Sequence, residues 1–518
     1  MRPAASVRKA TAALPLRLGA PAEFRRVADL LLRSAFDEPT VCKALGIDSL
    51  ANLGTVHRGG VDLTAIDSAL ALLIKAFVLL EPIAADDLAA GLDRDTLAAL
   101  EALDLVRVGK DQAYYAPVLL YPVHGCWIAS DRHDNPDGSP FVAPPDVVFP
   151  AIFAGTLRFL RVIPKSASEQ ALDLCSGSGI GALVLSRSVR HVVASDLTAR
   201  ATHFAQFNRL LNGCENVEVV QGDLYQPVAG RQFDRIVAHP PYVPALSASP
   251  QVFRDAGDTG ESVLQRIVEG LPQHLRPAGV FCAVSAAWDT ESAPFEARAR
   301  RWLGAHAAEF DVTFAQQEEM SPEQVARWLT EKAHVTDPAV RAEWEQQFTG
   351  AGLERNVYGA LVVRRRAQAD RVVPPQTVRV RLSGGTEGSD LEWALRWYRW
   401  RAAREAAGEL SAALLKAAPR LAPGLQVKVT YAPHNGELGM TQVVLEAERP
   451  FRAATKIDTW MLPLVAGFGS GRRMQDVYDG ARAAGAMPEG FGIHEFGTMV
   501  TMLIERGYLE LDGEVGTE

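Results

Sequence analysis

The chain has 518 residues, too many for a single hydrophobic core, and this length predicts about two to four domains. With 48% hydrophobic and 22% charged residues, the composition excludes a disordered or fibrous protein, and no apolar run is long enough to span a bilayer. The formal net charge of −9 argues against a protein whose main task is to coat nucleic acid, because a polyanion would be repelled.

The N-terminus and the cysteines indicate a protein of the reducing cytoplasm. The basic residues Arg2, Arg8 and Lys9 are not followed by the apolar run and small-residue cleavage site of a signal peptide. The five cysteines include no C-x-x-C pair, which argues against both a zinc site and a disulfide framework. We therefore expect a cytoplasmic protein without a membrane partner.

Residues 1–130 are predicted to form a helical N-terminal domain. Apolar residues recur at helical spacing over residues 24–56 and 86–103. Two extended runs follow at 105–108 and 114–118, so the order of helices and hairpin is typical of a winged helix. The two carboxylates of residues 93–97 would face DNA phosphates, and we therefore favour a packing or substrate-presenting role over DNA binding.

Residues 131–138 combine acidic side chains with a histidine, a set that fits the ligands of a metal ion. The same segment contains an Asn-Pro and an Asp-Gly pair, which are typical of a polar turn. We favour the turn and predict no bound metal.

The central region, residues 145–366, alternates short β-branched runs with helical stretches. This order is expected of an α/β domain in which helices cover both faces of a parallel, Rossmann-like sheet. Two more extended runs, at 311–314 and 358–364, predict a hairpin at the sheet edge. The parallel strands are expected at residues 171–174, 192–195, 217–221, 235–238 and 279–285.

Residues 372–518 are predicted to form a C-terminal α+β domain, with strands at 378–380 and 426–429 around a tryptophan-rich helix. Trp393, Trp397 and Trp400 alternate with arginines at the three- and four-residue spacing of one helix face. Such a stripe packs in a core more often than it binds nucleic acid, so we favour core packing. Neither terminal region shows a catalytic cluster.

A glycine-rich loop at residues 173–181 directly follows a predicted strand and opens a helix. Glycines at such a turn let the backbone approach a ligand closely. A dinucleotide-binding loop reads G-x-G-x-x-G, whereas this loop reads G-x-G-x-G with an acidic residue four positions before the first glycine. The pattern resembles the methyltransferase loop that holds the amino acid part of S-adenosylmethionine, which implies cofactor contacts for Asp173, Cys175, Gly177, Gly179 and Gly181.

Two further acidic residues end the next two predicted strands. Asp196 stands where a carboxylate accepts hydrogen bonds from both ribose hydroxyls. Asp223 stands where a carboxylate accepts from the adenine amino group, while the backbone N–H of Leu224 serves the ring. Each acid alone would also fit a helix cap, but acids at three successive strand ends of one sheet predict a nucleoside site. The expected cofactor is S-adenosylmethionine.

The fourth predicted strand ends in His239-Pro240-Pro241-Tyr242. Residues 145–290 here resemble methyltransferases with an Asn-Pro-Pro-Tyr motif, namely the HemK-type glutamine methyltransferases and the small-domain ribosomal RNA guanine methyltransferases. Residues 204–212, 254–260 and 275–279 extend the similarity. The resemblance implies a seven-stranded sheet with an antiparallel edge and places the motif's residues at the target nitrogen. In that family the Asn and first Pro carbonyls accept hydrogen bonds from the target NH₂, and the Tyr stacks on its plane.

This sequence departs from the family at two positions. His239 replaces the Asn, and it is interpreted as a single hydrogen-bond acceptor, as a general base, or as a brace for the Pro-Pro turn. Cys175 stands where the family usually has glycine, and we expect a small, inert thiol there.

Three functions follow. We favour N-methylation of a planar amino or amide nitrogen, in a protein glutamine or in RNA, with the flanking domains supplying specificity. A small-molecule, biosynthetic methyltransferase with His239 as base is the second. The third is a non-catalytic module that binds the cofactor or nucleic acid.

Overall fold

The computed structural model describes residues 14–57, 60–109, 112–135, 139, 141–244, 252, 255–332, 335–434 and 437–511. The chain divides into two compact units, and each is described by itself. The first comprises Met1–Leu160 and Ala167–Ile267, and the second comprises Arg161–Ser166 and Val268–Glu518. Among the described residues, no helix is long and apolar enough to cross a membrane.

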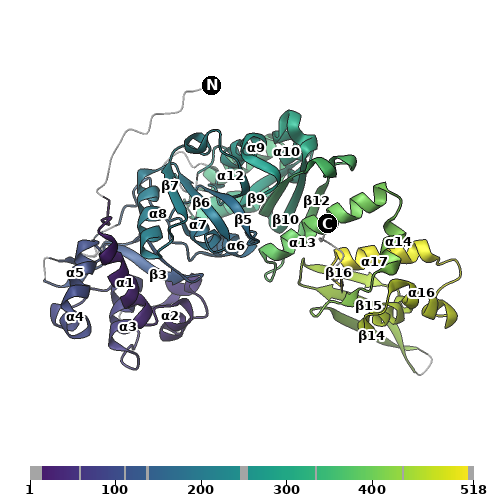
Figure 1. Cartoon of the computed structure of the whole chain (residues 1–518), viewed down its shortest axis with the longest axis horizontal. Coiled ribbons are helices and arrows are strands. Elements are labelled where there is room, and N and C mark those ends of the chain that lie inside the picture. The colour runs from purple at the N-terminus through teal and green to yellow at the C-terminus, as the bar shows by residue number, and fades with distance from the viewer. Residues whose placement is uncertain are drawn as a thin grey trace. The chain divides into compact units, whose positions relative to one another are not determined.

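The described part of the first unit starts with the α-helices α1 to α5, drawn in purple to blue in Figure 1. The single helix expected over residues 24–56 is wrong in extent, because a left-handed residue, Ala35, ends the first helix and Asp37 caps a second one. The Asp37 side chain accepts from the Thr40 N–H at 2.8 Å, as a helix N-cap does. The helices are α1 (Pro21–Arg33), α2 (Glu38–Leu45), α3 (Ser68–Leu73), α4 (Ala85–Gly91) and α5 (Arg94–Ala102).

Two hairpins follow these helices. The predicted hairpin is confirmed by β1 (Arg107–Val108) and β2 (Tyr114–Tyr115), which pair antiparallel. A second hairpin, β3 (Val118–Val123) with β4 (Cys126–Asp131), was not predicted. All six residues of β3 are buried, so the polar alternation that marks a half-exposed strand is absent. The winged-helix assignment stays a prediction.

Four parallel strands of the first unit confirm the expected α/β core. They lie in the order β8-β5-β6-β7 and are β5 (Ser168–Leu174), β6 (Val189–Asp196), β7 (Val217–Gln221) and β8 (Phe233–Ala238). Leu172, Val193 and Ile236 have no exposed surface, as expected for strands covered on both faces. The accompanying helices are α6 (Ala154–Val162), α7 (Ile180–Leu185), α8 (Ala199–Leu211) and α9 (Ser262–His274).

The register of these strands brings their carboxyl ends to one edge. Leu174 of β5 pairs with Ser195 of β6 on one side and with Ala238 of β8 on the other. Asp196 pairs with Gln221 of β7. Residues that follow the four strands therefore start from the same level of the sheet, where ligands of open α/β sheets bind.

The second unit supplies the antiparallel strands. They are β9 (Leu275–Thr290), β10 (Phe310–Met320) and β11 (Leu353–Arg365), with α10 (Phe295–Trp302), α11 (Pro322–Lys332) and α12 (Pro338–Gly350) between them. The expected hairpin of β10 and β11 is confirmed, but β12 (Thr377–Arg381) pairs parallel with β10 outside it. The strands of the second unit lie in the order β12-β10-β11-β9, so β12 adds a strand that was not expected in this sheet. The strand expected at 378–380 belongs to this sheet and not to the C-terminal one.

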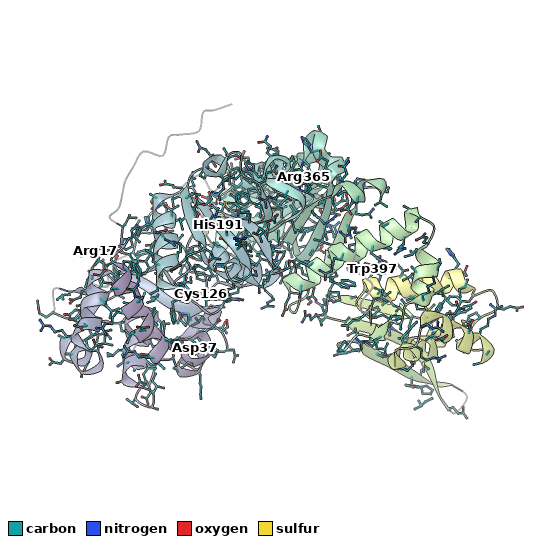
Figure 2. All side chains as sticks on the ribbon, viewed as in Figure 1. Arg17, Asp37, Cys126, His191, Arg365 and Trp397 are labelled. Carbon is teal, nitrogen blue, oxygen red and sulfur yellow. The ribbon has the colours of Figure 1, made fainter. Side chains whose placement is uncertain are left out.

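The C-terminal part of the second unit packs helices on a three-stranded antiparallel sheet. The sheet contains β14 (Gln426–His434), β15 (Glu437–Ala447) and β16 (Ala453–Ile457), and β13 (Arg420–Leu421) pairs with β17 (Leu509–Glu510). Trp397 of α13, labelled in Figure 2, is fully buried and stacks with Trp393 and Trp400, so the tryptophan stripe packs in a core. The helices are α13 (Gly388–Ala406), α14 (Leu410–Lys416), α15 (Leu462–Gly467), α16 (Met474–Ala483) and α17 (Ile493–Glu505).

Candidate functional site at the carboxyl edge of the parallel strands

The glycine-rich loop between β5 and α7 has an unusual backbone. Cys175, Gly177 and Gly179 have φ values of 55°, 54° and 82°, all in the left-handed region. Glycine adopts this conformation freely, whereas other residues pay about 1–2 kcal/mol for it. The alternation of glycines is therefore explained by the backbone, and so is the family's preference for glycine where this chain has Cys175.

Asp173 lies behind this loop. Its carboxylate is 2% exposed and accepts a hydrogen bond from the Ala182 N–H at 2.8 Å. A Cβ at Gly181 would come within 2.7 Å of the same carboxylate, so only glycine fits there. Burial, together with the charge of Asp196, raises the pKa of Asp173 to about 7. The contacts of Asp173 thus hold the turn that begins α7.

Asp196, at the end of β6, binds the same loop from the other side. One oxygen accepts from the Gly177 N–H at 2.9 Å, and the other accepts from the Thr198 N–H at 3.1 Å. Burial raises the pKa of the Asp196 carboxyl, and the backbone N–H groups oppose that rise. The predicted ribose acid therefore stands directly beside the glycine-rich loop.

Asp223 and Leu224 follow β7. Asp223 accepts a hydrogen bond from the Arg266 guanidinium at 2.6 Å, and both side chains are about half exposed. Leu224 has a φ of 49°, and its carbonyl accepts from the Ser195 hydroxyl at 3.3 Å. Arg266 was not predicted from the sequence, because a single arginine on a helix has no distinguishing pattern.

The three predicted acids all raise the pKa of one loop residue, Cys175. Burial raises the pKa of the Cys175 thiol far above its usual range, and the charges of Asp196, Asp173 and Asp223 raise it further. The thiol therefore stays protonated, as expected for an inert cysteine. A cluster of carboxylates fits a ligand that carries cationic groups and hydroxyl donors, as S-adenosylmethionine does. The acceptor groups of the described residues thus suit this cofactor.

His239 leaves β8 next to the loop. Its ring stacks on Phe159 of α6, with centroids 5.4 Å apart and planes 12° apart, and lies 6.0 Å from the Tyr242 ring. Its Nε2 atom is buried and has no hydrogen-bond partner among the described residues. Burial, and secondarily the charge of Arg158, lowers the pKa of His239 to about 4, so the imidazole is neutral near pH 7. Phe159 was missed because an aromatic residue in an amphipathic helix looks like ordinary core.

Gly260 supports the backbone that carries the His-Pro-Pro-Tyr motif. It has a φ of 82°, and a Cβ there would lie 2.4 Å from the Tyr242 carbonyl oxygen. The Ala256 N–H donates to the Val243 carbonyl at 3.0 Å, which ties the same two segments together. The similarity at residues 254–260 is thus explained for Gly260 by close packing, and Arg254 lies outside the described residues.

Comparison with known proteins identifies the segment that carries this site. Residues 150–290 match the family model described as methyltransferase small domain. The match supports a class I methyltransferase domain in this segment, similar to the HemK-type proteins. The methyltransferase domain contains the glycine-rich loop, the two further strand-end acids and the His-Pro-Pro-Tyr motif, so the predicted family is confirmed.

Similar proteins modify glutamine. The ribosomal protein uL3 glutamine methyltransferase of Bradyrhizobium diazoefficiens is 28% identical over 198 residues, which are 34% of this chain and 62% of that protein. The release factor glutamine methyltransferase of Xylella fastidiosa is 30% identical over 145 residues, 26% of this chain and 52% of that protein. The chain thus spans about half to three-fifths of these relatives. A solved structure, the ribosomal protein L11 methylase of Lactobacillus delbrueckii subsp. bulgaricus, is 16% identical with a TM-score of 0.24, covering 41% of this chain and 77% of that one.

Within the methyltransferase domain, the predicted residues form two groups on neighbouring strands. The first comprises the loop and the acids that surround it, and the second comprises the motif that follows β8. Their strands pair directly, Leu174 with Ala238, so both groups begin at the same level of the sheet. This is the arrangement that a transfer between a bound cofactor and a bound target requires.

Proposed function

We propose that this protein transfers the methyl group of S-adenosylmethionine to the side-chain amide nitrogen of a glutamine in a protein. The observation that carries the proposal is the buried Nε2 of a neutral His239, which has no hydrogen-bond partner in the described part of the chain. His239 follows the strand next to the one that leads into the loop and its three acids. Relatives named for ribosomal protein uL3 and for release factors support a cytoplasmic substrate from the translation machinery.

Residues of the first group would hold the cofactor. Asp196 accepts from the ribose hydroxyls, Asp223 and the Leu224 N–H serve the adenine, and the loop of Gly177, Gly179 and Gly181 receives the amino acid part. Asp173 would position the loop for the amino acid part, because it holds the turn that begins α7. The half-exposed Arg266 pair of Asp223 contributes about 0–1 kcal/mol, so its partner exchanges readily. When bound, the cofactor supplies an electrophilic methyl group on a sulfonium.

Residues of the second group would hold the target amide. His239 Nε2 accepts one N–H and the Pro240 carbonyl accepts the other, while the Tyr242 ring stacks on the amide plane. Pro241 fixes the turn between them because its φ is restricted. Two acceptors direct the nitrogen lone pair at the methyl group. Transfer forms the N–C bond, breaks the S–C bond, and releases one amide proton to solvent.

The low pKa of His239 favours an acceptor over a general base. A base works best when its pKa lies near the working pH, and burial holds this imidazole well below that. A small-molecule methyltransferase that uses His239 as base is therefore the weaker alternative.

Labelled transfer tests the proposal directly. Purified protein is incubated with methyl-labelled S-adenosylmethionine and a cell lysate separated into protein, RNA and low-mass fractions. We expect label in protein, recovered after digestion as N-methylglutamine. Label confined to RNA or to the low-mass fraction would contradict the glutamine assignment. Cofactor binding without any transfer would instead indicate the non-catalytic module.

A further inference from the structure

Helix α8 connects the glycine-rich loop to the β3–β4 hairpin through one side chain. Asn208 has no exposed surface. Its amide NH₂ donates to the Ser178 carbonyl at 2.9 Å and to the Ala129 carbonyl at 3.0 Å. Its amide oxygen accepts from the Ala129 N–H at 2.7 Å. The side chain therefore bonds the loop and strand β4 at the same time.

Ser178 lies in the middle of the glycine-rich loop. It lies between Gly177 and Gly179, both left-handed, and is itself buried. Gly179 also packs against α8, because a Cβ there would come within 3.0 Å of the Ala205 Cβ. Ala205 and Asn208 are three residues apart and share one helix face. That face of α8 is thus the support on which the loop rests.

Strand β4 forms hydrogen bonds with α8 along the edge that does not pair with β3. One edge of β4 pairs with β3, and the backbone groups of Trp127 and Ala129 point to the other. Asn212 donates to the Trp127 carbonyl at 2.7 Å and accepts from its N–H at 2.9 Å, repeating the Asn208 pattern one turn later. A buried ion pair between Arg200 and Asp131 adds a third link.

We propose that Asn208 is a positioning residue of the cofactor loop, through which the β3–β4 hairpin fixes the loop in the shape that binds S-adenosylmethionine. The identity of the ligand rests on the proposed function, whereas the loop contact itself does not. An acceptor-only side chain at 208 repels both the Ser178 and the Ala129 carbonyl oxygens, so the loop loses its support. The β3–β4 hairpin then supports the cofactor site.

The chain offers a matched control. Asn208→Asp and Asn212→Asp make the same chemical change, one turn apart, and both remove a donor to a β4 carbonyl. Of these two asparagines, Asn208 is the one whose side chain bonds the glycine-rich loop in the described structure. Effects that arise from the hairpin alone should therefore appear in both variants. Effects that arise from the loop should appear in Asn208→Asp and not in Asn212→Asp.

Two measurements separate the possibilities. Hydrogen exchange of the loop amides, measured without any cofactor, should accelerate at least about 10-fold in Asn208→Asp relative to Asn212→Asp. Calorimetry should show the S-adenosylmethionine Kd raised at least about 10-fold in Asn208→Asp and changed less than about 2-fold in Asn212→Asp, with the rate at saturating cofactor retained. The Asn208→Ala and Asn212→Ala pair replaces the Asp variants if Asn208→Asp does not fold.

Equal effects of the two variants, or no effect of either on exchange and Kd, would overturn the positioning role. Wild-type protein that takes up no S-adenosylmethionine would refute the proposed function, and the exchange comparison would still decide the loop contact.

Discussion

Replacing His239 tests how the target nitrogen is held. His239→Asn supplies an amide oxygen, which is the acceptor of the related motif, and His239→Ala removes the acceptor. Because Nε2 is buried and unpartnered among the described residues, neither change breaks a hydrogen bond that the structure shows for this atom. Differences in rate then report the contact with the target. His191→Asn is the control, since His191 lies on β6 and contacts Glu218.

The size of the effect follows from one hydrogen bond. An N–H left buried without an acceptor costs about 1–3 kcal/mol, which is about 5- to 150-fold in kcat/KM. We therefore expect His239→Ala to lower kcat/KM by about 10- to 100-fold. His239→Asn should stay within about 3-fold of wild type or exceed it. A general base would behave differently, because its loss costs about 10²-fold or more whichever residue replaces it.

Initial rates of labelled methyl transfer from about pH 5 to about pH 9 decide between these cases. With a His239 pKa of about 4, the wild-type rate should not titrate with this residue across that range, because the imidazole is neutral throughout. Protonation below the range would remove the acceptor and lower the rate. An acid limb with an apparent pKa of 6 to 7 that disappears in His239→Asn, together with a 100-fold loss, would refute the acceptor role.

Other changes test the loop, the pKa shift and the motif's support. Asp196→Ala should raise the Kd for S-adenosylmethionine at least about 10-fold in calorimetry, since it removes both the proposed ribose acceptor and the Gly177 contact, and an unchanged Kd would contradict the assignment. The pKa of Asp173 is raised to about 7, so the folded protein keeps this proton up to about pH 7, whereas the unfolded chain loses it above about pH 4. The free energy of unfolding should therefore fall as the pH rises from about 4 to about 7. Asp173→Asn should flatten that fall in urea titrations, and an equal slope would show that other groups cause it. Gly260→Ala should lower kcat/KM at least about 10-fold, because the new Cβ displaces the Tyr242 backbone. Gly230→Ala is the control and should leave kcat/KM within about 2-fold, because Gly230 has a similar φ of 79° and a Cβ there would meet no heavy atom of the described structure within 4 Å.

Regular patterns made the parallel core predictable. Short β-branched runs alternate with helices there. Of the confirmed strands, β7 has the predicted bounds, β5, β6 and β8 begin two or three residues earlier than predicted, and β6 ends one residue later. The strand-end residues were found because ligands of such sheets bind at one edge, which turns positions in sequence into positions in space. The left-handed φ values at Gly177 and Gly179 then agree with what those glycines allow.

Features set by tertiary contact were not predictable. Strand β3 is buried along its whole length, so no alternation of polar and apolar residues marked it. Strand β12 pairs with β10 although a proline-containing linker before it indicated a new domain. The Arg266 partner of Asp223 comes from a helix far along the chain. Phe159 is a core residue by any local rule, and its stacking on His239 depends on where α6 packs. Local sequence carries none of these pairings.

The site therefore depends on residues well outside the segment that marks the family. The family match begins at residue 150, yet the loop carbonyl at Ser178 is held by a side chain that is itself held by Ala129. A buried amide that satisfies two backbone segments is costly to replace, because any substitute leaves buried polar groups unpaired on both sides. A truncated protein beginning at residue 150 would keep every motif but lose the partner of Asn208 in β4. Its motifs alone would then not be enough to maintain the shape of the loop.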